Sequence, residues 1–171
     1  FAMHYRRTRP ATSDIAPMGI GPQVALLYTT CNDFVEVSAE SCIDLTYANY
    51  TMYVLDDSSD ALYRARVDAF AARHPGRVRV VRRADRRGFK AGNMNNALQT
   101  VAYEPFFAVV DADEILPRDF LSRLVPRMLA DPQCGFIQAN HRCLDDSDNA
   151  LKHDMHVGID VHWRWYQPLR N

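Results

Sequence analysis

The sequence lacks several features that would assign it to a specialised class of protein. Its four cysteines are scattered, and none forms the Cys-x-x-Cys pair of a zinc ribbon or a redox motif. No apolar run is long enough for a transmembrane helix, and no basic-then-apolar signal segment opens the chain. We therefore expect a soluble chain with reduced thiols in the reducing, cytoplasmic compartment, although a longer parent protein could still be membrane-bound.

An excess of charge of one sign is also missing. The 171 residues include 20 Lys and Arg and 21 Asp and Glu, a net charge of −1, so no nucleic-acid partner is expected. The apolar fraction of 47% and the chain length suit one globular domain with a sizeable core. One local basic run fits either a solvated strand edge and loop or a surface near an anionic ligand. It contains Arg77, Arg79, Arg82, Arg83, Arg86, Arg87 and Lys90.

Short apolar runs alternate with helical patterns from residue 24 onwards. Strands are predicted over 24–28, 52–55, 78–81, 106–110 and 135–138, and helices over 34–47, 60–73, 90–102 and 117–130. This alternation predicts an α/β fold of three layers with a mostly parallel sheet. Residues 1–22 have no periodicity and suit a leader or linker. Residues 23–140 hold the α/β domain, and residues 141–171 break its rhythm as the incomplete start of a further region.

Three of the predicted strands end in polar clusters. These are Thr29-Thr30-Cys31-Asn32-Asp33, Asp56-Asp57-Ser58-Ser59-Asp60 and Asp111-Ala112-Asp113-Glu114. In parallel sheets, ligands bind beyond the carboxyl ends of the strands. The convergence of these clusters at one edge is the main functional signal in the sequence.

The pair Asp111 and Asp113 directly follows the apolar strand 106–110. Carboxylates in such a place need compensation, because an unpaired buried charge is costly. Mg²⁺ and Mn²⁺ favour oxygen ligands and usually take one or two carboxylates plus substrate phosphates. The pattern therefore favours a divalent metal site, and a pair of turn or helix-capping carboxylates before Pro117 is the structural alternative.

Two further segments favour a nucleotide ligand. Asp56 and Asp57 come too early to cap the next helix and can accept hydrogen bonds from a nucleobase or a ribose, whereas Ser59 or Asp60 suits the N-cap. Around Lys90, two glycines allow close backbone approach, and the start of the next helix supplies free N–H groups that favour anions. The segment lacks the Gly-Lys-Ser/Thr ending of a P-loop and the spacing of a Rossmann fingerprint.

In this order, the motifs resemble the inverting family 2 glycosyltransferases of the GT-A fold, the three-layer α/β/α fold of nucleotide-diphospho-sugar transferases. The motifs are Thr-Thr-Cys-Asn-Asp, Asp-Asp-Ser-Ser-Asp, Gly-Phe-Lys-Ala-Gly-Asn-Met-Asn-Asn-Ala-Leu and Asp-Ala-Asp, and the match covers about residues 24–140. The nearest branch contains cellulose synthase and related membrane-embedded polysaccharide synthases. Thr29 stands where that family commonly has proline.

The resemblance implies roles for individual residues. It places Thr30, Asn32 and Asp33 in the loop that lines the nucleotide pocket, and Asp56 and Asp57 against uracil and ribose. It places Lys90 near the nucleotide, Asp111 over the ribose and sugar, and Asp113 as the main ligand of Mg²⁺ or Mn²⁺. The implied activity is transfer of a sugar, with inversion, from a UDP-sugar donor to a hydroxyl of a glycan or other acceptor in polysaccharide synthesis.

The family's catalytic base, an aspartate in a Thr-Glu-Asp-type motif, is not present, nor are its Gln-x-x-Arg-Trp motif and transmembrane helices. The resemblance thus implies a truncated fold, an N-terminal part of the catalytic domain that binds nucleotide without efficient transfer. It also implies a parent protein embedded at the cytoplasmic face of a membrane. The alternatives are a non-catalytic nucleotide- or glycan-binding module and a nucleotidyltransferase, which would need a basic Gly-rich loop after the first strand.

Two minor features lie near the end of the chain. His153 and His156 have helical spacing, but no matching Cys/His pair accompanies them, so scattered surface histidines are favoured over a zinc site. The amphipathic segment 157–166 suits packing in a core or against a further region, with acceptor-glycan or membrane-interface contact as the alternative.

Overall fold

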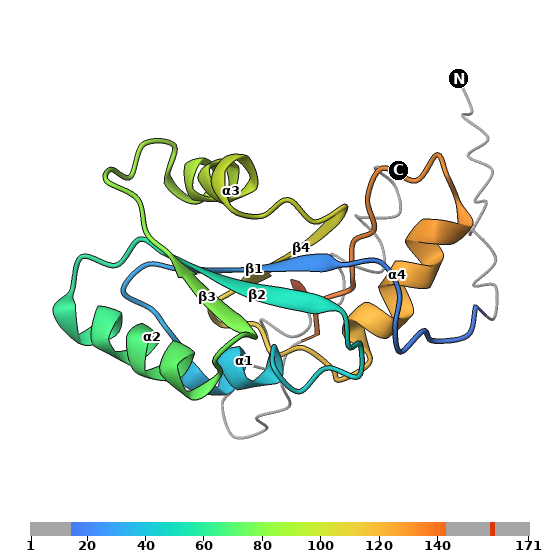
Figure 1. The fold of residues 1–171 in the computed structure, drawn as a ribbon, viewed down its shortest axis with the longest axis horizontal. Helices are drawn as coiled ribbons and strands as arrows, with labels where there is room; N and C mark the ends of the chain where they lie inside the picture. Colours follow the sequence, from blue (N-terminus) through green and yellow to red (C-terminus); the bar gives the residue numbers. More distant parts are fainter. Residues whose placement is uncertain (1–14, 143–157, 160–171) are drawn as a thin grey trace. The chain divides into compact units, whose positions relative to one another are not determined.

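The computed structural model describes residues 15–142 and 158–159 of the chain, which forms two compact units that divide between Pro132 and Gln133. The first unit is an α/β domain, drawn in Figure 1. Its elements are β1 (Val24–Thr30), α1 (Glu36–Ser41), β2 (Tyr50–Asp56), α2 (Ala61–Arg73), β3 (Val78–Val81), α3 (Phe89–Thr100), β4 (Phe106–Asp111) and α4 (Phe120–Ala130). In the second unit, residues 133–142 form no regular secondary structure.

The four strands form one parallel sheet in the order β3-β2-β1-β4. This arrangement confirms the predicted α/β class. The register pairs Thr29 of β1 with Leu55 of β2 and with Asp111 of β4, so the polar segments that follow these strands start at the same level of the sheet. The carboxyl edge therefore brings together clusters that lie about 25 to 80 residues apart in the sequence.

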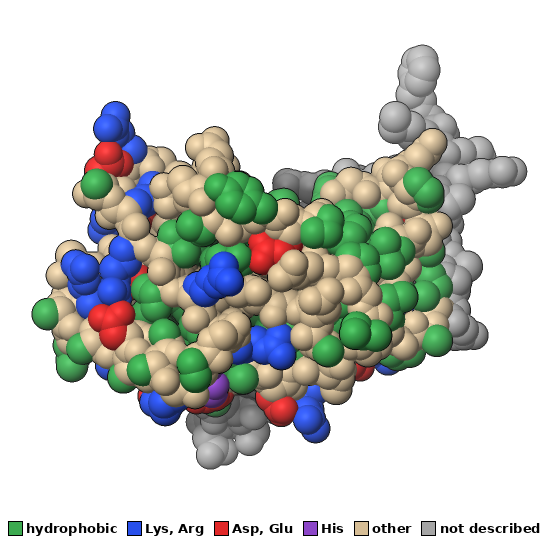
Figure 2. Space-filling view, viewed as in Figure 1, with side chains coloured by type: hydrophobic (Ala, Val, Ile, Leu, Met, Phe, Trp, Pro, Cys, Tyr) green, Lys and Arg blue, Asp and Glu red, His purple; other side chains and the backbone are tan. Residues whose placement is uncertain are grey.

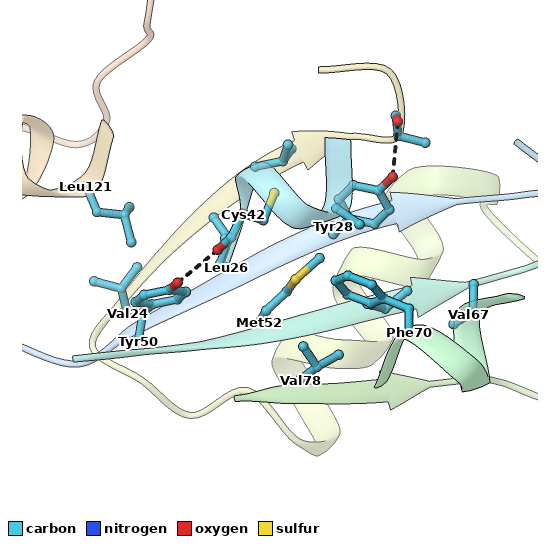
Figure 3. Packing of buried hydrophobic residues seen from close by; sticks show 14 of the residues in the cluster. Val24, Leu26, Tyr28, Cys42, Tyr50, Met52, Val67, Phe70, Val78 and Leu121 are labelled. Atoms are coloured by element: carbon cyan, nitrogen blue, oxygen red, sulfur yellow. Dashed lines mark hydrogen bonds between the residues drawn. The ribbon is translucent and has the colours of Figure 1, made fainter. Parts of the chain in front are cut away.

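Alternate residues of the strands point to opposite faces of the sheet, as the period of two requires. On one face, Leu26, Tyr28 and Met52 pack with α1, α2 and α4 in the larger core, part of which is shown in Figure 3. On the other face, Leu27 and Leu55 pack with Ala97 of α3 and its neighbours. Figure 1 accordingly shows α3 alone above the sheet, with α1 and α2 below it.

Three expectations about secondary structure need correction. The strand expected over 135–138 does not form, and Phe136 is 75% exposed. Residues 135–138 are Gly-Phe-Ile-Gln, and so short an apolar run specifies a strand only where a neighbouring strand edge pairs with it. The helix expected over 34–47 shortens to α1, because Thr46 and Ala48 donate their N–H groups to Arg118 and Gly19 instead of to a preceding helical turn.

The third correction is that α4 starts at Phe120 and not at Pro117, whose carbonyl accepts from the Phe120 N–H in a turn. The other predicted elements are observed with shifts of one or two residues at their ends. Asp60 caps α2 as expected, since its carboxylate accepts from the Leu62 N–H at 2.8 Å. No helix in the described part of the chain is long and apolar enough to cross a membrane.

Candidate functional site

A pocket of about 460 Å³ opens at the carboxyl edge of the sheet. The ends of β1, β2 and β4, the loops after them and the first turns of α3 supply its walls. It is lined by Thr29, Thr30, Cys31, Asp33, Val35, Leu55, Asp57, Arg86, Lys90, Asn93, Asp111, Ala112 and Asp113. The structure thus brings together six of the eight residues that the sequence singled out, and leaves Asn32 and Asp56 outside the lining.

Asp111, the last residue of β4, is held by several partners. The hydroxyl of Thr29 donates to its Oδ1 at 3.0 Å, and Lys90 forms an ion pair with the same oxygen. The Asp111 N–H donates to the carboxylate of Glu114 at 2.9 Å, which closes the turn after the strand. The hydroxyl of the buried Tyr28 donates to the Ala112 carbonyl at 3.0 Å. The backbone that carries the acidic pair is therefore fixed from the sheet below.

Asp113 differs from Asp111 in that its side chain is exposed and has no hydrogen bond or ion pair with the described residues. Its oxygens can accept a cation without breaking a contact. The described residues contain no group of three or more His, Cys, Asp or Glu that could hold a metal by itself. Two carboxylates fit Mg²⁺ or Mn²⁺ only if a ligand and water supply the other oxygens, as these ions usually require.

In the loop after β1, the side chains of Asp33 and Asn32 make different contacts. Asp33 accepts from the Thr30 hydroxyl at 2.8 Å and from the Cys31 N–H at 2.6 Å, within the pocket wall. Asn32 has a left-handed φ of 61° and turns its amide toward the loop after β2. Its Oδ1 accepts from the N–H groups of Ser59 and Asp60, both at 3.0 Å. Asn32 therefore braces two loops, and its contact with a nucleotide stays a prediction.

Arginines pair with both carboxylates at the end of β2, which the sequence patterns did not indicate. Asp56 is 2% exposed and accepts from Arg82 Nε at 2.8 Å and from the Ser58 N–H at 2.9 Å. Asp57 takes a bidentate contact from Arg83, at 2.9 and 2.6 Å, and this pair also is almost fully buried. These contacts raise the pKa of Arg83, chiefly through the hydrogen bonds to Asp57.

Arg83 also determines where α3 begins. Its guanidinium donates to the carbonyls of Arg87 and Phe89 at 2.7 and 2.9 Å, on either side of the left-handed Gly88. A Cβ on Gly92 would collide with the Arg87 carbonyl, so the loop packs closely against the helix. Through this loop, the buried Asp57–Arg83 pair fixes the first turn of α3 and with it Lys90.

The basic run is thus neither a purely solvated edge nor a simple anion site. Its Arg82 and Arg83 are structural, and Arg87 pairs with Asp85 in solvent. Arg86 lines the pocket and donates to the sulfur of Cys31 at 2.8 Å. Figure 2 shows Lys and Arg side chains gathered on the side where the strands end. Lys90 and Arg86 are the two members of the run that face the pocket.

One further pocket residue, Asn93, belongs to the Gly-Phe-Lys-Ala-Gly-Asn motif, but the sequence pattern indicates no role for it. It lies on α3, is 2% exposed, and its Oδ1 makes no hydrogen bond in the described structure. An unsatisfied buried polar atom costs about 1–3 kcal/mol. Only the combination of burial and pocket position distinguishes Asn93 from the neighbouring asparagines 95 and 96.

The predicted features near the end of the chain lie outside the described residues. These are His153, His156 and nearly all of the amphipathic segment 157–166. Among the described cysteines, Cys31, Cys42 and Cys134 are free thiols. Burial raises the pKa of Cys42 to about 12, so this thiol stays protonated at neutral pH. The boundary expected near residue 140 and the reducing compartment stay predictions.

Comparisons with known proteins identify the family of the chain. Residues 27–171 match Glycosyl transferase family 2. A rice protein, "Probable glucomannan 4-beta-mannosyltransferase 6" of Oryza sativa subsp. japonica, is 30% identical over 116 residues, which are 65% of this chain and 20% of the rice protein. "Putative cellulose synthase 2" and "Putative cellulose synthase 3" of Komagataeibacter xylinus are each 30% identical over 160 residues, 89% of this chain and 10% of theirs.

The chain therefore spans a tenth to a fifth of the length of these relatives. The family match covers most of the chain, including β2, β3, β4 and every residue that lines the pocket. Together with the all-parallel α/β sheet, it identifies the kind of protein: this chain belongs to glycosyl transferase family 2, in a branch that is similar to cellulose synthase.

Proposed function

We propose that the pocket binds a nucleoside diphosphate sugar, of the UDP type, together with Mg²⁺ or Mn²⁺. The observation that carries this proposal is the pocket itself. It gathers Asp111, Asp113 and Lys90 at one sheet edge, with room for a ligand of a few hundred cubic ångströms. Asp113 is exposed and unpaired among the described residues, as a ligand for an incoming cation should be.

The charges of the pocket suit a diphosphate. Lys90 and Arg86 supply two cations to the pocket, and Asp111 and Asp113 supply two carboxylates. A diphosphate placed between them needs a divalent cation against the carboxylates, and that ion would neutralise charge on the leaving group. Lys90, half exposed and now paired with Asp111, can turn its ammonium to a phosphate oxygen once a cation takes over that carboxylate.

The first loop and β2 would frame the nucleoside. Thr30 and Asp33 form one wall, with Asp33 already accepting from the loop backbone. Asp57 lies beside this wall, since its N–H donates to the Thr30 carbonyl at 3.0 Å. Arg83 occupies both of its carboxylate oxygens, so Asp57 retains less capacity for ribose or uracil than a free carboxylate would. Asp56 and Asn32 support this wall from outside the pocket lining and would act on the nucleotide through it.

The whole enzyme, by this proposal, transfers the sugar with inversion to a hydroxyl of a growing polysaccharide. The names of the relatives, a glucomannan mannosyltransferase and cellulose synthases, support a polysaccharide acceptor. The aspartate base that deprotonates the acceptor would lie outside this chain, so the 171 residues alone should bind donor without efficient transfer. We place the parent protein at the cytoplasmic face of a membrane, where nucleotide sugars meet an elongating polymer.

Titration calorimetry with UDP tests the donor site. We expect binding in Mn²⁺ that weakens at least tenfold in EDTA. Asp113→Asn should weaken Mn²⁺-dependent binding to a similar extent while the melting temperature stays the same, because that side chain has no contact to lose. Asp44→Asn is the matched control, since Asp44 is an exposed carboxylate that pairs with Arg118 away from the pocket. Absence of UDP binding with metal present would refute the proposal.

A further inference from the structure

Asn93 occupies a position on α3 that helical periodicity assigns to the core. Residues 93, 97 and 101 follow one another at four-residue spacing, and so lie on one face of the helix. Ala97 is fully buried in the smaller core, and Val101 packs against that core. An apolar residue at position 93 would continue the stripe. The chain instead has an amide there, at the end of the stripe that meets the pocket.

The amide oxygen of Asn93 is buried and has no partner in the described structure. Buried polar groups are hydrogen-bonded in the great majority of proteins, so an exception needs a reason. The nearby polar groups do not supply a donor. The Thr29 hydroxyl is directed to Asp111 and the Val110 carbonyl, and the Arg83 guanidinium is directed to Asp57 and two backbone carbonyls. A donor for this oxygen therefore has to come from a molecule that enters the pocket, either water or a ligand.

We propose that Asn93 is a specificity-determining residue, whose Oδ1 accepts a hydrogen bond from an N–H or O–H group of the nucleoside of the bound donor. This inference rests on the proposed function of the pocket. An acceptor oxygen excludes the diphosphate as its partner, because ionised phosphate oxygens do not donate. In a uridine nucleotide, the groups that can donate are the N3–H of the base and the 2′ and 3′ hydroxyls of the ribose.

The surroundings of Asn93 favour this assignment. Asp57 lines the same pocket, but Arg83 already takes both of its oxygens, so Asn93 is the buried acceptor that retains full capacity. Lys90 lies three residues earlier on the same face of α3 and is half exposed. Both residues line the pocket, so a ligand whose phosphate pairs with Lys90 lies beside the buried Asn93 amide, which is 2% exposed.

Asn93→Leu separates a ligand-binding role from a structural one. The two side chains have similar volumes, and leucine removes the unpaired oxygen, so the variant should melt at the same temperature as the wild type or higher. Its affinity for UDP in Mn²⁺ should fall at least tenfold. Asn95→Leu is the matched control, because Asn95 lies two residues away on α3, is exposed and undergoes the same gain in helix propensity.

Analogues of UDP identify the donated group. We expect the wild-type 171-residue chain to bind at least one of 2′-deoxy-UDP, 3′-deoxy-UDP and N3-methyl-UDP tenfold or more weakly than UDP. Asn93→Leu should lose that discrimination, while Asn95→Leu keeps it, as in a double-mutant cycle with the ligand as the second partner.

The possible failures are distinct. A wild-type chain that binds no UDP in Mn²⁺ overturns the proposed function, and this inference with it. A wild-type chain that binds UDP while Asn93→Leu binds it equally well overturns the role of Asn93 alone. A fall in the melting temperature of Asn93→Leu below that of Asn95→Leu, with discrimination among the analogues unchanged, would show that Asn93 is a structural core residue.

Discussion

The ion pair between Arg83 and Asp57 should contribute more to stability than any other charge contact at the site. Arg83→Met keeps the length and the apolar part of the side chain but removes four hydrogen bonds, two to Asp57 and two to the carbonyls of Arg87 and Phe89. The two side chains are 9% and 7% exposed, so the variant leaves the Asp57 carboxylate buried and unpaired.

Removal of one partner of a buried ion pair costs about 3–5 kcal/mol, and we expect about 3 kcal/mol here because the pair borders the open pocket. In a domain of this size, such a loss lowers the melting temperature by roughly 6–12 °C. Urea denaturation and calorimetric melting of the 171-residue chain would both measure it. UDP affinity should fall as well, because the freed loop no longer fixes the first turn of α3.

A double-mutant cycle with Asp57→Asn isolates the pair. The double variant should be more stable than the sum of the single losses predicts, by about 2 kcal/mol, because the neutral amide no longer leaves a buried charge without a cation. Arg87→Met is the control, since Arg87 is 91% exposed and its contact with Asp85 should have no measurable effect on melting. Equal melting temperatures for Arg83→Met and Arg87→Met would refute the reasoning.

Two further predictions concern the loop before α3 and the buried core. Gly92→Ala should lower the free energy of unfolding, measured in urea, by about 1–3 kcal/mol, because the new Cβ collides with the Arg87 carbonyl. This loss is expected although alanine has the better helix propensity, and a variant as stable as the wild type would contradict it. Burial raises the pKa of Cys42 and Tyr28 to about 12, so between about pH 9 and 12 only the unfolded chain loses these protons. The free energy of unfolding should therefore be constant from neutral pH to about pH 9 and fall as the pH rises toward 12. Urea melts that give the same stability at pH 8 and pH 11 would contradict this.

The sequence alone was sufficient for the framework of the domain. The continuous apolar runs over 24–28 and 52–55 predict buried strands, and the helical spacing between them predicts helices, because an apolar pattern is local information. The position of the acidic clusters was also predictable, because parallel strands end at one edge of the sheet whatever else the fold does. The family assignment follows from these motifs in their order and is supported by the match over 27–171.

Elements that depend on distant partners were not predictable in this way. The helix pattern over 34–47 continued in the sequence, but the chain leaves the helix after Ser41 because Thr46 and Ala48 find backbone partners elsewhere. The short apolar segment 135–138 was expected to form a strand, but no strand in the described part of the chain pairs with it. A local sequence pattern shows which secondary structures a segment can adopt, and contacts with distant parts of the chain determine which of them forms.

The same distinction applies to the candidate site. The sequence alone identified Asp111, Asp113 and Lys90 as pocket residues, because carboxylates after a buried strand and a lysine at a helix start have few structural uses. In the sequence, Arg83 is one member of a basic run, and only the tertiary structure shows that it is the buried partner of Asp57, 26 residues away. The tertiary structure also made Asn93 different from Asn95, since the orientation of α3 against the sheet buries one amide beside the pocket and leaves the other in solvent.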